Sequence, residues 1–128
     1  MLDAKENLFK QLRSIDMANA KEELLGTLAK RNSLIKCAYI KRDMGYWDDK
    51  DSYISAAPIT LREGYTPEEF EEFLNKLDFE YDSGYGMQEL SGIVWLMEEH
   101  TWLSRGEYDG SEWWEYNKCP KVPDELKA

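Results

Sequence analysis

The sequence lacks the residue patterns that usually identify an enzyme or a metalloprotein. It contains one histidine, His100, and two cysteines, Cys37 and Cys119, which lie far apart. Neither cysteine has a second cysteine or a histidine at zinc-site spacing, so we expect both to be small buried side chains in a reducing compartment. The glycines form neither a phosphate-binding loop nor a dinucleotide fingerprint. The sequence therefore predicts no catalytic residue, no metal and no cofactor.

Long apolar runs are also missing. No stretch approaches the roughly 18 apolar residues that a membrane-spanning helix needs, and the opening segment MLDAKENLFKQ lacks the apolar core of a signal peptide. Hydrophobic residues make up 42% of the chain and charged residues 33%, which is typical of a globular domain. We expect one domain over residues 1–128, located in the cytoplasm of a host cell and without membrane contact.

Positive charge is scarce, and it is unevenly distributed. The chain has 16 Lys and Arg against 26 Asp and Glu, a net charge of −10. Residues 1–42 hold nine basic and five acidic side chains, whereas residues 43–128 hold seven basic and 21 acidic ones. Such an acidic body repels phosphate backbones, which disfavours direct nucleic-acid binding and favours a partner with a basic surface. The alternative is that the acidic residues only keep the protein soluble.

The N-terminal part is predicted to be helical over residues 1–32. Helix starts are expected at Asp3 and at Asn19, because each is followed three residues later by a glutamate that can complete a capping box. Apolar residues at helical spacing follow both starts. Whether the segment forms one helix or two stays open. We divide the domain into this helical segment, an α+β core over 33–123 and a tail over 124–128.

In the core, composition predicts a β-hairpin followed by a helix. Strands are expected over 34–42 and 53–61, with Pro58 placing the second strand at a sheet edge. The sequence TPEEFEEFLNKL predicts a helix over 67–77, because Thr66 can cap it and a proline occupies its first turn.

The last part of the chain is predicted to be a three-stranded antiparallel meander. It follows a glycine-punctuated loop over 79–86 and begins at Gln88. Asp109-Gly110 is a strong signal for a two-residue hairpin turn, and Glu99-His100 is a weaker one. The fold class is therefore α+β: an N-terminal helical segment, a β-hairpin, a helix and the meander.

Two-residue turns would fix the register of the meander. One face would then pair Arg105 with Trp114, Leu103 with Tyr116, Val94 with Arg105 and Leu96 with Leu103. The other face would collect Ile93, Trp95, Met97, Trp102 and Trp113, with Gly106 opposite Trp113 and leaving room for its indole. Both faces are apolar, so each needs a cover. The helix over 67–77 can cover one face, and the N-terminal helices, a partner protein or a ligand would cover the other.

The same register sets Glu107 against Glu112. Two like charges directly opposed across a hairpin destabilise it, so the pair would attract a cation, a basic partner or a proton, or its carboxylates would turn apart into solvent. Paired carboxylates beside tryptophans are also typical of glycosidases. Acidic residues are so common in this chain that we do not predict hydrolysis from them.

Four motifs are similar to those of a known group of proteins. They are FEYDSGYG (79–86), QEL-x-G-x-VW (88–95), W-x-x-RGEYDGSEWWE (102–115) and CP-x-x-P (119–123). Over residues 61–123 the chain resembles small, largely uncharacterised proteins of bacteriophages and other viruses. The resemblance implies no catalytic residue. It implies a context in which small acidic proteins bind and redirect a host protein, and some inhibit a defence nuclease, such as a CRISPR nuclease, by occupying its basic groove.

We therefore expect a non-catalytic accessory protein that binds a basic host protein. The carboxylates expected to steer that partner are Glu68, Glu71, Glu72, Asp78, Glu80, Asp82, Glu107, Asp109 and Glu112. The exposed aromatic anchors are expected to be Tyr46, Trp47, Tyr85 and Tyr108. Two alternatives remain. One is a small-molecule or carbohydrate module with Trp95, Trp102 and Trp113 lining a pocket. The other is an oligomeric structural protein whose uncovered sheet face meets its own copy.

Overall fold

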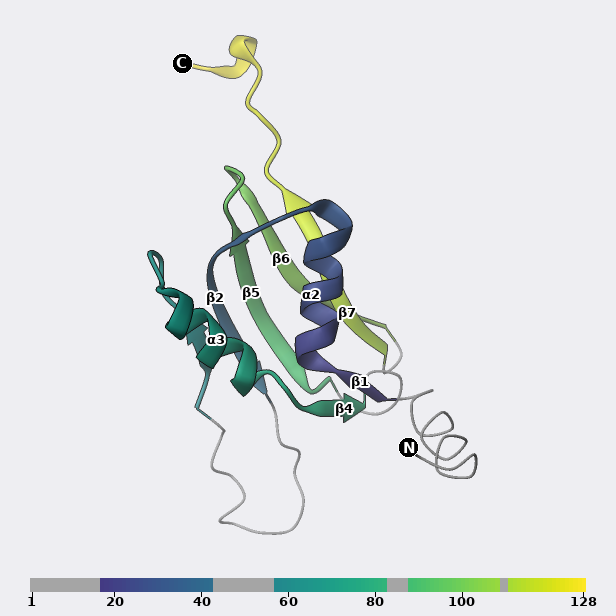
Figure 1. Cartoon of the computed structure of the whole chain (residues 1–128). Coiled ribbons are helices and arrows are strands. Elements are labelled where there is room, and N and C mark those ends of the chain that lie inside the picture. Colours follow the sequence, from purple (N-terminus) through teal and green to yellow (C-terminus); the bar gives the residue numbers. More distant parts are fainter. Residues whose placement is uncertain (1–16, 43–56, 83–87, 109–110) are drawn as a thin grey trace, which may run out of the picture.

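The computed structural model describes residues 17–42, 57–82, 88–108 and 111–128, which form an α+β fold (Figure 1). The main sheet is antiparallel and consists of β2 (Ile35–Arg42), β3 (Ile59–Leu61), β5 (Leu90–Leu96), β6 (Thr101–Tyr108) and β7 (Ser111–Lys118), in the order β3-β2-β5-β6-β7. A two-stranded sheet pairs β1 (Met17–Asn19) with β4 (Glu80–Asp82). The helices are α2 (Ala20–Arg31), α3 (Pro67–Lys76) and a short 3-10 helix (Asp124–Leu126). No helix in the described part of the chain is long and apolar enough to cross a membrane.

Helix α2 begins where the second capping signal predicted. The Asn19 side chain accepts a hydrogen bond of 3.0 Å from the backbone N–H of Glu22, and Asn32 ends the helix in the left-handed conformation with φ 50°. The helical prediction is wrong for Met17–Asn19, which form strand β1, because these residues pair with β4. Strand β4 was not predicted, because it lies within the loop expected over 79–86. The predicted start at Asp3 lies outside the described residues.

The predicted helix after Thr66 is confirmed as α3. The Thr66 hydroxyl accepts a hydrogen bond of 3.2 Å from the backbone N–H of Glu69, and a proline occupies the first turn. Phe73 and Leu77 are buried and hold the helix against the sheet. Burying two such side chains stabilises the fold by about 3–6 kcal/mol.

The predicted hairpin is also present, and it is part of the same sheet as the meander. Strand β2 matches its predicted range, whereas β3 covers only the last three residues of the range 53–61 and lies at the sheet edge that Pro58 predicted. On its other side β2 pairs with β5. The backbones approach closely at Gly92, which has φ 141° and would place a Cβ atom 2.2 Å from the carbonyl oxygen of Tyr39.

The meander has the predicted register between β6 and β7 but not between β5 and β6. Arg105 pairs with Trp114 as expected, whereas Val94 pairs with Leu103 instead of Arg105. The reason is the connection between β5 and β6, which spans Met97–His100 and is longer than a two-residue turn. His100 adopts φ 62° at its end. Because the register shifts by an even number of residues, every side chain keeps its predicted face.

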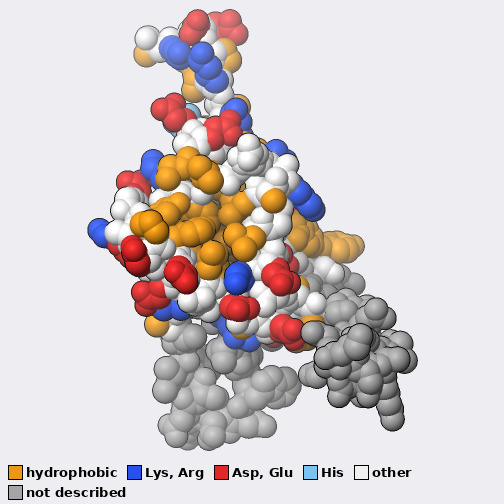
Figure 2. Space-filling model, in the orientation of Figure 1, with side chains coloured by type: hydrophobic (Ala, Val, Ile, Leu, Met, Phe, Trp, Pro, Cys, Tyr) orange, Lys and Arg blue, Asp and Glu red, His pale blue; other side chains and the backbone are white. Residues whose placement is uncertain are grey.

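Both helices pack on the same face of the main sheet, as Figure 1 shows. The core lies between them and the strands, and its largest fully buried side chains are Tyr81, Phe73, Leu24, Ile35, Ile40, Leu77, Leu90, Leu103 and Val94. Further hydrophobic side chains gather at the surface between α2 and α3 (Figure 2). The described N-terminal helix therefore does not cover the opposite face, where no described helix packs.

Candidate functional site: an exposed aromatic sheet face

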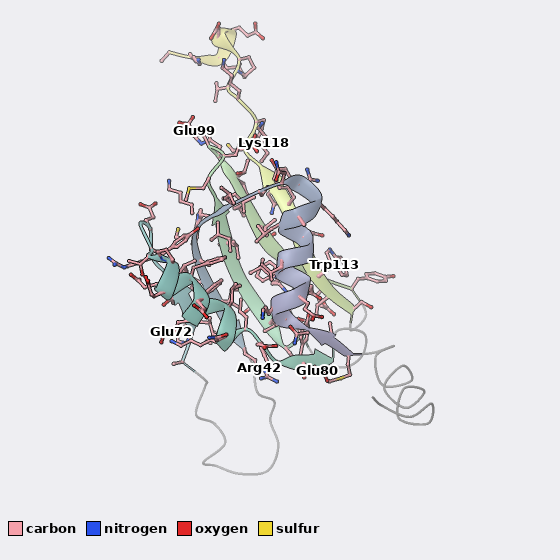
Figure 3. The ribbon with its side chains drawn as sticks, viewed as in Figure 1. Arg42, Glu72, Glu80, Glu99, Trp113 and Lys118 are labelled. Atoms are coloured by element: carbon pink, nitrogen blue, oxygen red, sulfur yellow. The ribbon has the colours of Figure 1, made fainter. Side chains whose placement is uncertain are left out.

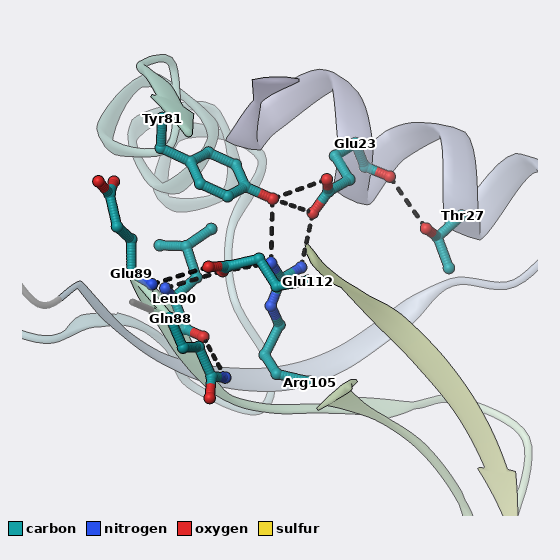
Figure 4. Close-up of polar contacts among 8 residues, drawn as sticks. All are labelled: Glu23, Thr27, Tyr81, Gln88, Glu89, Leu90, Arg105 and Glu112. Atoms are coloured by element: carbon teal, nitrogen blue, oxygen red, sulfur yellow. Dashed lines mark hydrogen bonds and ion pairs between the residues drawn. The ribbon is translucent and has the colours of Figure 1, made fainter. Parts of the chain in front are cut away.

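Beneath helix α2 lies a buried ionic cluster centred on Arg105 (Figure 4). Its Nη1 donates to Oε1 of Glu23 at 2.6 Å, and its Nη2 donates to Oε1 of Glu112 at 2.6 Å and to the Tyr81 hydroxyl at 2.9 Å. The Tyr81 hydroxyl in turn donates to the Glu23 carboxylate at 2.6 Å. These contacts connect α2, β4, β6 and β7, and the side chains of Arg105 and Glu112 are 2% and 0% exposed.

The pKa values in this cluster follow from its burial and its pairing. Burial raises the pKa of Tyr81, and the hydrogen bond to Glu23 raises it further because it stabilises the phenol. Burial alone would lower the pKa of Arg105, but the hydrogen bonds to Glu23 and Glu112 outweigh it, so this pKa is raised. Both raised pKa values favour a neutral Tyr81 phenol and a charged Arg105 guanidinium. Because Arg105 and Glu112 are almost completely buried, a substrate cannot reach them, and we interpret the cluster as structural.

Glu112 is therefore not the surface carboxylate that the sequence predicted. Its two oxygens accept the backbone N–H groups of Glu89 at 2.8 Å and Leu90 at 3.0 Å, so it holds the start of β5. Its charge is compensated by Arg105, which points to the same side of the sheet. Glu112 does lie opposite Glu107 in the register, as expected. Arg105 thus compensates the charge of Glu112, whereas Glu107 lies exposed at the surface.

The predicted acidic residues of α3 form one exposed group. Glu68, Glu71 and Glu72 are all exposed on this helix, and Figure 3 labels Glu72 beside it. Asp78 follows the helix and accepts a hydrogen bond of 2.9 Å from the Asn19 side chain. Glu80 is exposed on β4. This group lies on the helix-covered side of the sheet.

The other predicted partner-binding residues are only partly described. Glu107 and Tyr108 are exposed at the end of β6, and Tyr108 has 77% of its surface accessible. Asp82 lies in β4, opposite Met17. The remaining ones lie outside the described residues: Tyr46, Trp47, Tyr85 and Asp109.

The face of the sheet opposite the helices carries aromatic side chains from four neighbouring strands, exposed on three of them and half-buried at Trp102 on β6. Tyr39 pairs with Ile93, and Trp95 pairs with Trp102. Tyr39 is 46% exposed, Trp95 41% and Trp113 37%. The sequence predicted that the tryptophans and Ile93 lie on this face. It did not place Tyr39, because the strand of Tyr39 was predicted without a register. We call this set, Tyr39, Ile93, Trp95, Trp102 and Trp113, the aromatic face.

The Trp113 indole lies over Gly106, as its predicted register required. A Cβ atom on Gly106 would lie 2.6 Å from the indole Nε1, which donates a hydrogen bond of 3.1 Å to Oε1 of Glu115. Glycine thus provides the space that the ring occupies. The indole thus lies close to the β6 backbone at Gly106, and its hydrogen bond to Glu115 orients it.

A hollow of about 340 Å³ lies at one end of the aromatic face, beside the turn between β5 and β6. Trp95 and Trp102 line it together with Met97, Glu98, Glu99 and Cys119. Trp113 does not, so the predicted three-tryptophan pocket contains two of its three members. Figure 3 places Glu99 and Lys118 at this end of the sheet.

The two cysteines are less buried than the sequence predicted. Cys119 is exposed at the hollow, because it follows the end of β7, and Cys37 is half-buried. Burial raises the pKa of the Cys37 thiol, and the nearby Glu63 carboxylate adds to this effect. Among the described residues, no three His, Cys, Asp or Glu side chains are grouped as metal ligands.

Comparisons of the chain with models of protein families, with curated proteins and with solved structures gave no match. The resemblance of residues 61–123 to small phage proteins therefore stays a prediction. Function has to be argued from the aromatic face itself.

Proposed function

We propose that the protein is a non-catalytic binding protein that uses its aromatic face to contact a partner protein. One observation carries this proposal: several large hydrophobic side chains are exposed on the face of the sheet on which no described helix packs. Monomeric proteins rarely expose contiguous apolar surface without an interaction to cover it. The centres of protein interfaces are rich in aromatic residues, and the aromatic face is rich in them too.

Charge favours a basic protein as the partner over a second copy of the chain. Two molecules that each carry a charge of −10 repel one another, whereas a basic protein is attracted. The α3 carboxylates Glu68, Glu71 and Glu72 lie on the opposite side of the sheet from the aromatic face. They would therefore speed association through their long-range field rather than through contact. A phage-type accessory protein that blocks a basic groove of a host protein would fit this arrangement.

The buried cluster supports a binding role over hydrolysis. Glu112 was one of the carboxylates considered for glycosidase chemistry, and its ion pair with Arg105 and its burial keep it from any substrate. General acid–base catalysis requires a group within hydrogen-bond reach of the substrate. Binding through apolar contact needs no such group.

Two point variants test the proposal. Ile93→Lys places a charge in the middle of the aromatic face, and Leu126→Lys is its control, because Leu126 is 72% exposed in the C-terminal tail. Both variants are used with the wild type to capture proteins from a host lysate, and the captured protein is then purified and titrated by calorimetry. We expect one basic protein that binds the wild type and Leu126→Lys equally, and Ile93→Lys at least tenfold more weakly.

Two results would contradict the proposal. One is a partner that binds Ile93→Lys as tightly as the wild type. The other is a stable dimer in light scattering that Ile93→Lys dissociates, because the aromatic face would then be covered by a second copy.

A further inference from the structure

We propose that the hollow between Trp95 and Trp102 binds a guanidinium group, namely an arginine side chain of the basic partner. This inference rests on the proposed function and assigns the partner residue that occupies one end of the aromatic face. The two indoles pair across β5 and β6 and line the hollow together. Indole rings attract cations, and the flat guanidinium group stacks on them favourably.

The charges around the hollow favour a cation. Lys36 lines the hollow together with His100, and Lys118 lies nearby, but both lysines already have a carboxylate partner. Lys118 Nζ lies 3.0 Å from Oε1 of Glu98, and Lys36 Nζ lies 3.4 Å from Oε1 of Glu63. Glu98 also accepts a hydrogen bond of 3.2 Å from the Tyr116 hydroxyl. Glu98 is thus occupied from two sides.

Glu99 is the carboxylate at the rim of the hollow that is available to a bound cation. It is exposed, it lines the hollow, and within the described ranges it has no ion pair. A guanidinium group stacked on Trp95 or Trp102 would bring its positive charge towards this carboxylate. The rim therefore offers a negative charge beside two cation-attracting rings.

Arginine fits these features better than lysine does. An ammonium group is compact and strongly hydrated, whereas guanidinium is planar and more weakly hydrated, so it loses less on entering an apolar hollow. Arginine is also enriched, with tryptophan, among the residues that dominate binding energy at interfaces. A neutral sugar would stack on the same indoles but would bring no positive charge to pair with Glu99.

The test is an NMR titration of the full-length ¹⁵N-labelled protein with the capped tripeptide Ac-Gly-Arg-Gly-NH₂. The probe signals are the indole N–H groups, assigned by single Trp→Phe variants. We expect the Trp95 and Trp102 signals to move saturably, with a Kd on the order of millimolar. Trp113 on the same face and Trp114 in the core should not move. The same peptide with citrulline, which has the shape of arginine without its charge, should bind at least fivefold more weakly.

Two substitutions then test the assigned contacts. Glu99→Gln should weaken binding of the arginine peptide about two- to fivefold, whereas Glu125→Gln, which changes another exposed carboxylate in the tail, should leave it unchanged. Trp102→Leu should weaken it about tenfold. An unchanged Trp114 signal shows that Trp102→Leu is folded. If Trp102→Leu is not folded, the result with Glu99→Gln decides whether the assigned contacts are right.

Absence of a saturable shift at Trp95 and Trp102, or equal binding of the citrulline peptide, would overturn the inference. The proposed function can fail separately. If the arginine peptide binds the hollow but Ile93→Lys leaves the partner's affinity unchanged, the aromatic face is not the protein interface. If Ile93→Lys disrupts the complex and Glu99→Gln affects neither peptide nor partner, the interface stands and the arginine pocket does not.

Discussion

Arg105 and Glu112 lie on neighbouring strands with 2.6 Å between Nη2 and Oε1, and both side chains are almost completely buried. Their ion pair extends to Glu23 on α2 and to backbone N–H groups at the start of β5. The Arg105 guanidinium group and its partner Glu112 thus connect helix α2, the β6–β7 hairpin and the start of strand β5. The aromatic face on the opposite side of this sheet depends on those strands keeping their register.

Replacing Arg105 with methionine should strongly destabilise the protein. The substitution leaves the carboxylates of Glu23 and Glu112 near each other in the interior without their cation. Breaking a buried ion pair by removing one partner typically costs about 3–5 kcal/mol. We expect a decrease of that size in the free energy of unfolding, measured by urea denaturation followed by circular dichroism.

A triple variant distinguishes the effect of uncompensated buried charge from the effect of the changed side-chain shape. Adding Glu23→Gln and Glu112→Gln to Arg105→Met removes the uncompensated charges, and it should recover at least half of the lost stability. If Arg105→Met alone stays within about 1 kcal/mol of the wild type, the cluster is not important for stability.

The ion pair between Arg62 and Glu69 predicts a pH dependence near the start of α3. The Arg62 guanidinium donates two hydrogen bonds of 2.8 Å to the Glu69 carboxylate and lowers its pKa to about 2. Because the pKa is lower in the folded state than its ordinary value of 4.5, this pair stabilises the fold above about pH 4.5. Its contribution decreases as the pH falls from there towards 2.

Carboxyl NMR signals followed as a function of pH measure this pKa directly. In Arg62→Gln the pKa of Glu69 should rise towards its ordinary value. The stability difference between variant and wild type should be largest above about pH 4.5 and should disappear near pH 2. A wild-type Glu69 that titrates near 4.5 would contradict the predicted ion pair.

Two glycine-to-alanine substitutions should change stability in opposite directions. In Gly92→Ala the new Cβ atom would lie 2.2 Å from the carbonyl oxygen of Tyr39, at a φ of 141° that alanine rarely adopts. The clash is with backbone, which cannot turn aside, so we expect a loss of about 3 kcal/mol or more. Gly26→Ala in α2 meets no atom within 4 Å and should stabilise by about 0.5–1 kcal/mol. Thermal denaturation of both variants checks this contrast.

Local signals predicted the elements that begin with a clear cap or turn. Asn19 and Thr66 cap the helices as predicted, and counting residues around positions 109 and 110 gave the β6–β7 register. The β5–β6 register was wrong because its connection is longer and places His100, rather than glycine, in the left-handed region. Strand β4 was missed because it pairs with residues far away in the chain.

The candidate site was predictable only in part, because some of its contacts join residues that are far apart in the chain. Alternation along the strands assigned the tryptophans of the aromatic face correctly. The burial of Glu112 depends on Arg105 and on Glu23 of a distant helix, so no local pattern reveals it. The predicted register did place Arg105 and Glu112 on one face, and that neighbourhood of opposite charges was the available signal. The hollow depends on the turn and on Cys119, which only the folded chain brings together.

Gly106→Ala should alter the aromatic face without unfolding the protein. Its Cβ atom would lie 2.6 Å from Trp113 Nε1 and 2.7 Å from Glu115 Oε1. Both contacts involve side-chain ends, which can move, and the backbone at Gly106 has no positive φ. We therefore expect a stability change of about 1 kcal/mol or less. The Trp113 indole N–H signal should shift while that of Trp114 stays in place.

The consequence for binding follows from the position of this indole. With Trp113 displaced and its hydrogen bond to Glu115 broken, the aromatic face loses the shape that a partner would contact, so affinity for that partner should fall severalfold. Ser33→Ala, at a half-buried position after α2, is the matched control and should bind like the wild type. A Gly106→Ala variant with a shifted Trp113 signal and unchanged affinity would place the contact elsewhere on the sheet, nearer Tyr39 and Trp95.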